Sequence, residues 1–167
     1  QTGSIWAWVP DISWSPDGKF LLAALPDNPD TDPLQSTNLA AINVSTRQVI
    51  VLYEDCGIFC TASAAIFSPD GGQYIAFLNS ILPDQSETSR YNLSVMDKDG
   101  SNQQKLFPDE GIQGLKIQSL FWEPVSTEGQ VPRIAFVSQG NLLFAELATG
   151  AIRQITGDGS IDKIDWK

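Results

Sequence analysis

The sequence predicts an all-β fold made of repeated four-stranded units, and three observations support this prediction. The apolar runs are short, rich in β-branched and aromatic residues, and bounded by Gly, Pro, Asp and Asn, which is typical of strands. No window of the sequence keeps the period of an amphipathic helix over several turns. Two sequence marks also recur together about every 50 residues along the 167-residue chain.

The first recurring mark is an aromatic strand that ends in a turn, and the second is an Asn-Leu pair that opens a strand. Copies of the first mark are Ile12–Gly18, Ala65–Gly71, the weaker Leu120–Pro124 and the short Ile164–Trp166. Copies of the second mark begin at Asn38, Asn92 and Asn141. Because the two marks are independent and share one period, we interpret them as structural repeats.

Each repeat contains four short apolar runs that we interpret as antiparallel strands. In the first repeat the predicted strands are Asp11–Ser15, Phe20–Leu25, Leu39–Val44 and Val49–Tyr53. In the second they are Ala64–Ser68, Tyr74–Leu78, Leu93–Asp97 and Lys105–Phe107. In the third they are Gln118–Trp122, Ile134–Ser138, Leu142–Leu147 and Ile152–Thr156. Units of this size and strand content predict β-propeller blades in a single domain, at approximately 9–55, 62–109 and 116–158, with 161–167 opening a further blade.

The turn residues explain how neighbouring strands are joined. In the Ser-Pro-Asp-Gly segments that end at Gly18 and Gly71, proline presets φ, Asp bonds its own backbone, and glycine accepts a positive φ. These segments join the first and second strands of their units. We expect 97–102 and 148–150 to join the third and fourth strands in the second and third units.

Residues 13–24 (SWSPDGKFLLAA), 66–80 (IFSPDGGQYIAFLNS) and 91–107 (YNLSVMDKDGSNQQKLF) also show a family resemblance. They resemble the TolB-type propeller repeat, a WD-like repeat with Ser-Pro-Asp-Gly in its first hairpin. The third unit departs from the pattern, because Glu123-Pro124 stands in place of Ser-Pro-Asp. The resemblance implies a β-propeller that serves as a binding scaffold in an exported bacterial protein, periplasmic or extracellular.

The number of repeats falls short of a closed ring. Closed propellers have about four to eight blades, and three repeats with an opening strand do not supply a fourth. We expect the chain to be a fragment of a larger propeller that self-associates, or one half of a six-bladed or seven-bladed ring. Trp14, Phe67 and Trp122 recur at one blade position, so each is expected to pack against a neighbouring blade. The outer face of the first blade and Ile161–Trp166 would then lack partners, and Ser4–Trp8 supplies one additional strand.

Charge predicts one strongly acidic end of the blades. The chain has 20 acids, 10 bases and a net charge of −10, which argues against nucleic acid and anionic membranes as partners. In a four-stranded meander the second turn shares an end with the connections between blades. The acids in these segments are Asp27, Asp30, Asp32, Glu54, Asp55, Asp84, Glu87, Asp109, Glu110 and Asp158. They keep the surface soluble, or they bind a cationic protein, or with loop carbonyls they bind Ca²⁺.

Residue types that the chain lacks exclude several kinds of site. The sequence contains no histidine, which excludes Ser-His-Asp and Cys-His catalysis and every histidine-ligated metal. Cys56 and Cys60 are the only cysteines, too few for a four-ligand zinc site, and they form a small-loop disulfide or remain two thiols. No apolar run reaches the roughly 18 residues of a membrane span, so we expect no membrane insertion by this chain.

These observations favour a non-enzymatic scaffold that binds another protein, with no cofactor apart from the Ca²⁺ considered above. No catalytic residue can be nominated. The alternative is an accessory propeller that gates a peptidase or belongs to a glycosidase, with the catalytic part outside this chain.

Overall fold

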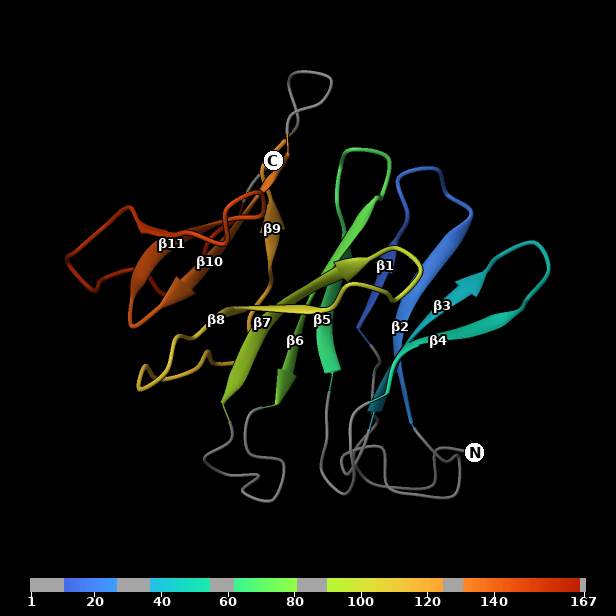
Figure 1. The fold of residues 1–167 in the computed structure, drawn as a ribbon, viewed down its shortest axis with the longest axis horizontal. Coiled ribbons are helices and arrows are strands. Elements are labelled where there is room, and N and C mark those ends of the chain that lie inside the picture. Colours follow the sequence, from blue (N-terminus) through green and yellow to red (C-terminus); the bar gives the residue numbers. More distant parts are fainter. Residues whose placement is uncertain (1–10, 27–36, 55–61, 81–89, 125–130, 166–167) are drawn as a thin grey trace.

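The computed structural model describes residues 11–26, 37–54, 62–80, 90–124 and 131–165, and these form three four-stranded antiparallel sheets (Figure 1). Strand order within each sheet follows the sequence, so each sheet is a meander. No helix occurs in the described residues. The predicted all-β class with three four-stranded antiparallel units is therefore confirmed. We call the sheets blade 1 (β1–β4), blade 2 (β5–β8) and blade 3 (β9–β12).

The strand bounds agree with the predicted repeats in order and number. Blade 1 contains β1 (Ile12–Trp14), β2 (Phe20–Pro26), β3 (Thr37–Asn43) and β4 (Val49–Tyr53). Blade 2 contains β5 (Ala62–Phe67), β6 (Tyr74–Ser80), β7 (Tyr91–Asp97) and β8 (Gln104–Phe107). Blade 3 contains β9 (Phe121–Trp122), β10 (Arg133–Ser138), β11 (Asn141–Glu146) and β12 (Ile152–Gln154). Figure 1 shows the three sheets side by side in chain order, without closing into a ring.

The Ser-Pro-Asp-Gly turns have the predicted construction. In blade 1, Ser15 Oγ donates to Asp17 Oδ1 at 2.7 Å and accepts from the Phe20 backbone N–H at 2.9 Å. In blade 2, Ser68 Oγ donates to Asp70 in the same way and accepts from the Tyr74 N–H at 2.9 Å. The serine thus links the turn to the start of the second strand in both blades. Gly18 has a φ of 70°, in the left-handed region that favours glycine.

The hydrophobic core lies between the sheets. One cluster joins blades 1 and 2, and in it the rings of Tyr53 and Phe77 lie 4.9 Å apart. A second cluster joins blades 2 and 3, with Phe107 and Phe136 rings 5.2 Å apart. Blade 2 is therefore covered on both faces, whereas blades 1 and 3 each have one inner face and one outer face.

Residues 161–165, where the sequence predicts the opening strand of a further blade, form no strand in the structure. The Ile161 N–H instead donates to the Gly140 carbonyl at 2.8 Å, and the Gly159 N–H donates to Asn141 Oδ1 at 3.0 Å. An opening strand pairs with the second strand of its own blade, and within the described residues no strand pairs with 161–165. The predicted strand therefore stays a prediction. Ser4–Trp8 and Trp166 lie outside the described residues.

Candidate interaction surface

The outer face of blade 1 consists of two rows of paired residues that run across its four strands. Side chains paired across neighbouring strands project to the same side, and successive residues alternate sides. Leu22 and Ala41 belong to the core shared with blade 2, so their neighbours in sequence point away from blade 2. We call this outer surface the first face. Its rows are Trp14, Leu21, Ile42 and Val49, and Ile12, Ala23, Ala40 and Val51.

The larger side chains of the first face are open to solvent. Ile12 is 63% exposed, Trp14 58%, Val49 51% and Val51 47%. Neither row contains a charged or polar residue. Ala23 and Ala40 in the middle of the second row are buried, so the exposed apolar side chains lie on the two edge strands, β1 and β4. Exposed apolar groups of this kind are typical of a contact with another protein.

The corresponding rows of the other two blades are covered. The aromatic residue of the repeat has the same pairing in each blade: Trp14 with Leu21, Phe67 with Ile75 and Trp122 with Ile134. Ile75 belongs to the core shared with blade 1, and Ile134 to the core shared with blade 2. Each of these rows thus faces the preceding blade. The first face is exposed because no described sheet precedes blade 1.

Trp122 shows how such a row is covered. Its side chain is only 9% exposed, and its indole Nε1 donates to the Ile66 backbone carbonyl of blade 2 at 3.2 Å. The indole ring therefore packs on apolar side chains while its polar N–H reaches a carbonyl of the neighbouring inner strand. This confirms the expectation that Trp122 packs against a neighbouring blade, and Phe67 likewise packs on the core between blades 1 and 2.

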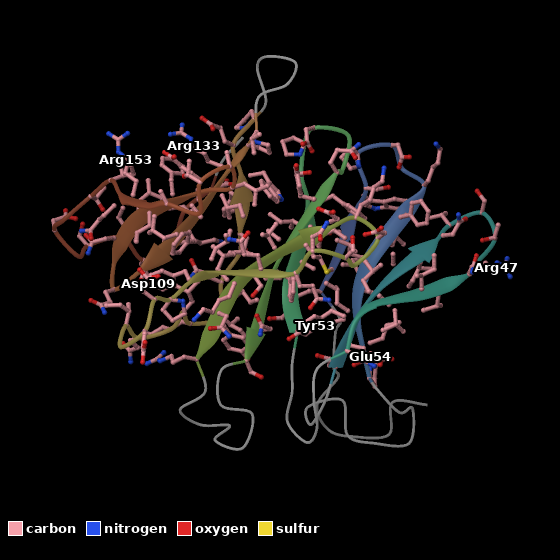
Figure 2. The ribbon with its side chains drawn as sticks, viewed as in Figure 1. Arg47, Tyr53, Glu54, Asp109, Arg133 and Arg153 are labelled. Carbon is pink, nitrogen blue, oxygen red and sulfur yellow. The ribbon has the colours of Figure 1, made fainter. Side chains whose placement is uncertain are left out.

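The outer face of blade 3 ends the other side of the stack, and we call it the last face. Its rows are Phe121, Ala135, Phe144 and Arg153, then Val137 and Leu142, and finally Arg133 and Glu146. Arg133 Nε donates to Glu123 Oε2 at 2.8 Å, and its guanidinium carbon lies 4.8 Å from the centre of the Phe144 ring. Figure 2 shows Arg133 and Arg153 on this blade. Charged side chains thus cover part of an apolar sheet.

The ion pair on the last face shifts the acid–base equilibria of both partners. The hydrogen bond from Arg133 lowers the pKa of Glu123, and the reciprocal bond raises the pKa of Arg133. Glu123 is the residue at which the third repeat departs from Ser-Pro-Asp. At the position where the first two repeats have the turn serine, the third repeat thus has a glutamate in a bidentate ion pair.

The predicted acidic residues are only partly described. Glu54, Asp109, Glu110 and Asp158 are exposed after the last strand of their blades, and Figure 2 shows Glu54 and Asp109 well apart. Hydrogen bonds from Ser160 lower the pKa of Asp158. Residues outside the described ranges are Asp27, Asp30, Asp32, Asp55, Asp84, Glu87, Cys56 and Cys60. Within those ranges no three Asp, Glu or Cys residues gather as a metal site would require. The acidic binding surface therefore stays a prediction.

Two clefts lie near the ends and inner strands of the blades. One of about 580 Å³ lies between residues 113–118, the β10–β11 turn and residues 159–162. The other, of about 340 Å³, lies between β1, β5 and residues 117–120. Asp162 is the one carboxylate that lines the first cleft, and Asp11 the one that lines the second. The described walls of these clefts thus offer no carboxylate pair of the kind glycosidases use.

Gln118 shows how the second cleft is bordered. Its side-chain Nε2 donates to the Val137 carbonyl at 2.8 Å, and its Oε1 accepts from the Val137 N–H at 2.7 Å. The Gln118 side-chain amide thus bonds to the Val137 backbone as a neighbouring strand would, and it extends the contact between β9 and β10.

Comparison with known proteins adds no assignment: no family model matches the chain, and no curated protein matches it. No helix in the described residues is long and apolar enough to cross a membrane.

Sequence reasoning nominated the acidic loops and anticipated an unpartnered first blade, but it did not name the residues around Trp14. A signal for them exists in the outermost strands. Lys105 lies in β8 and Arg153 in β12, whereas the exposed stretch Val49-Ile50-Val51 of β4 has no charge. An exposed outer strand without charge does not oppose contact with other chains.

Proposed function

We propose that the protein is a non-catalytic β-propeller scaffold for protein–protein interaction, and that it contributes three blades to a larger assembly. The observation that supports this proposal best is the first face, whose two uncharged apolar rows begin at Trp14 and Ile12 on β1 and whose counterparts in blades 2 and 3 are covered by the preceding blade.

The energy available from this surface is suited to a protein partner. Full burial of a large apolar side chain contributes roughly 1.5–3 kcal/mol, and Ile12, Trp14, Val49 and Val51 are each about half exposed. Association costs an estimated 4–15 kcal/mol, so several of these side chains must be covered together. A sheet that matches the two rows covers them together.

The chemistry of the partner follows from the covered copies. It presents a flat apolar sheet to Trp14 and its neighbours, and a backbone carbonyl to the indole N–H, as blade 2 does for Trp122. The accessory role in a hydrolase, the exported location and Ca²⁺ binding at the acidic loops remain predictions of the sequence.

Photochemical crosslinking in the cell that produces the protein tests the proposal. Benzoylphenylalanine at Val51 is expected to crosslink to a peptide that mass spectrometry assigns to a sheet of an identified protein, whether this chain or another. Trp14→Glu should abolish the crosslink. The matched control places the same group at Arg47, an exposed turn residue of the same blade (Figure 2). Equal crosslinking from both positions would contradict the proposal.

A further inference from the structure

We propose that the last face of a second copy of this chain covers the first face, with the Trp14 indole N–H bound to the backbone carbonyl of Phe121 in that copy. The inference rests on the proposed function, because it names the partner of the surface described there. The register of the three blades supports this contact.

Phe121 occupies the position in blade 3 that Ile66 occupies in blade 2. Each directly precedes the aromatic residue of its repeat, and each pairs with an alanine of the second strand: Ile66 with Ala76 and Phe121 with Ala135. Since Trp122 donates to the Ile66 carbonyl, the next aromatic residue along the stack would donate to the Phe121 carbonyl. Trp14 has the right pairing, and it is exposed.

The apolar pattern of the last face also matches the surface that blade 3 covers on blade 2. On blade 2 that surface has Ala76 paired with Val95, and Leu78 paired with Leu93. On the last face the corresponding pairs are Ala135 with Phe144, and Val137 with Leu142. Both surfaces have a small residue beside the inner strand and branched apolar residues towards the second turn. The last face can therefore pack against a row of side chains like the one that contains Trp122.

The two faces differ, so the contact is head-to-tail. Two copies related by a twofold axis then form two identical contacts, each between the first face of one and the last face of the other. Three blades from each copy make a ring of six. After the first contact forms, the second is intramolecular, which strengthens the pair by about 10²–10⁴-fold over a single contact. A pairing of two first faces would place Trp14 against Trp14 and leave both last faces open.

A complementation experiment distinguishes these arrangements. The first-face variant is Trp14→Glu with Val51→Glu, and the last-face variant is Leu142→Glu with Ile155→Glu. Ile155 follows Gln154 on β12, is 44% exposed and lies beside Leu142, to whose carbonyl its N–H donates at 2.8 Å. The control variant, Ile50→Glu with Ile112→Glu, changes two exposed apolar residues that lie on neither face, since Ile50 pairs with Ala41 on the opposite side of blade 1. Circular dichroism and thermal melting establish that each variant is folded.

Sedimentation velocity is then measured over a range of concentrations. We expect dimers for the natural chain and the control, monomers for each face variant alone, and a dimer when the two face variants are mixed. The mixed dimer has one intact contact and should be about 10²–10⁴-fold weaker than the natural one. In the natural dimer, benzoylphenylalanine at position 14 should crosslink to the peptide that contains Phe121.

Three results would overturn the inference. A dimer of the last-face variant alone would indicate pairing of two first faces. A mixture that stays monomeric at a concentration about 10⁴-fold above that at which the natural chain dimerises would exclude the head-to-tail contact. A natural chain that stays monomeric at high concentration would exclude self-pairing, and crosslinks from Val51 to a different protein would then support the proposed function without this inference.

Discussion

The first face and the last face end the same stack of blades and come from the same repeat, yet they meet solvent differently. On the first face, Trp14 and Ile12 are more than half exposed and no charge lies among them. On the last face, Phe121 and Phe144 are only partly exposed, and the Arg133–Glu123 pair lies over the Phe144 ring. Large apolar side chains of the first face are open to solvent, whereas the last face is partly covered by its own charged side chains.

The difference shows that position in the stack decides the exposure of a repeat residue. Trp14 and Trp122 have the same pairing in their blades, yet one is 58% and the other 9% exposed. The preceding blade accounts for the difference. A residue that packs against the neighbouring blade in the middle of a repeat array is exposed, and open to contact, at the end of the array.

The largest effect expected is a difference between the two tryptophans. Trp122→Ala should lower the free energy of unfolding by about 3–5 kcal/mol, because it leaves a cavity between blades 2 and 3. Trp14→Ala should lower that of the monomer by less than about 1 kcal/mol, because little buried contact is lost. Urea denaturation followed by circular dichroism at low protein concentration measures both. Similar losses would mean that Trp14 is also covered within one chain.

A smaller effect is expected when the cover of the last face is removed. Arg133→Ala and Glu123→Ala, alone and together, form a double-mutant cycle with an expected coupling of about 0.5–1 kcal/mol, since the pair is partly exposed. Loss of Arg133 also uncovers Phe144, so binding of an apolar dye should rise. A coupling of zero would show that the pair does not stabilise this end.

Lowering the pH should reduce the free energy of unfolding through protonation of Glu123 on the last face. The folded-state pKa of Glu123 is lowered, so its contribution to stability is complete above the unfolded pKa of about 4.5 and is lost as pH falls through the folded pKa. Carboxylates titrate between about pH 6 and pH 3. Over this range the free energy of unfolding should therefore fall less for Glu123→Gln than for the natural chain. Parallel curves for the two proteins would disprove the contribution.

The smallest effect on the free energy of unfolding is expected for a substitution on the first face. Val51→Lys should change the unfolding free energy of the monomer by no more than about 0.5 kcal/mol, because the side chain is 47% exposed. The same change should raise solubility, because a lysine on an outer strand opposes contact. Val95→Lys is the matched control at a buried position of blade 2, and it should prevent folding. A large loss for Val51→Lys would place that residue in the core.

Much of the fold could be predicted because each prediction depended on local residues. The serine of the first turn, followed by Pro, Asp and Gly, specifies the hairpin, and the turns at Gly18 and Gly71 were confirmed. The predicted strand Gln118–Trp122 was too long, since β9 contains only Phe121–Trp122. The Gln118 side chain occupies the N–H and carbonyl of Val137, a pairing that residue propensities do not reveal.

The candidate site was harder to predict, because it depends on which residues share a face over four strands. Ala40 pairs with Val51 in the register set by the β3–β4 turn, and a bulge beyond this pair makes Leu39 pair with Tyr53. Only the observed register places Val51 in the same row as Ile12. The sequence analysis nominated the acidic loops because acids are abundant there, whereas the exposed apolar side chains of blade 1 follow from the lack of a described sheet before it.

The hydrogen bond from Trp122 to Ile66 has a consequence for how such a protein can evolve. The donor occupies an aromatic position that recurs in each repeat, as tryptophan in blades 1 and 3 and phenylalanine in blade 2, and the acceptor is a backbone carbonyl, which any amino acid supplies. A blade copied by tandem gene duplication would therefore meet its neighbours with both of its faces already compatible. The number of blades can change by whole repeats without new interface mutations, and selection then acts on the two end faces of the stack.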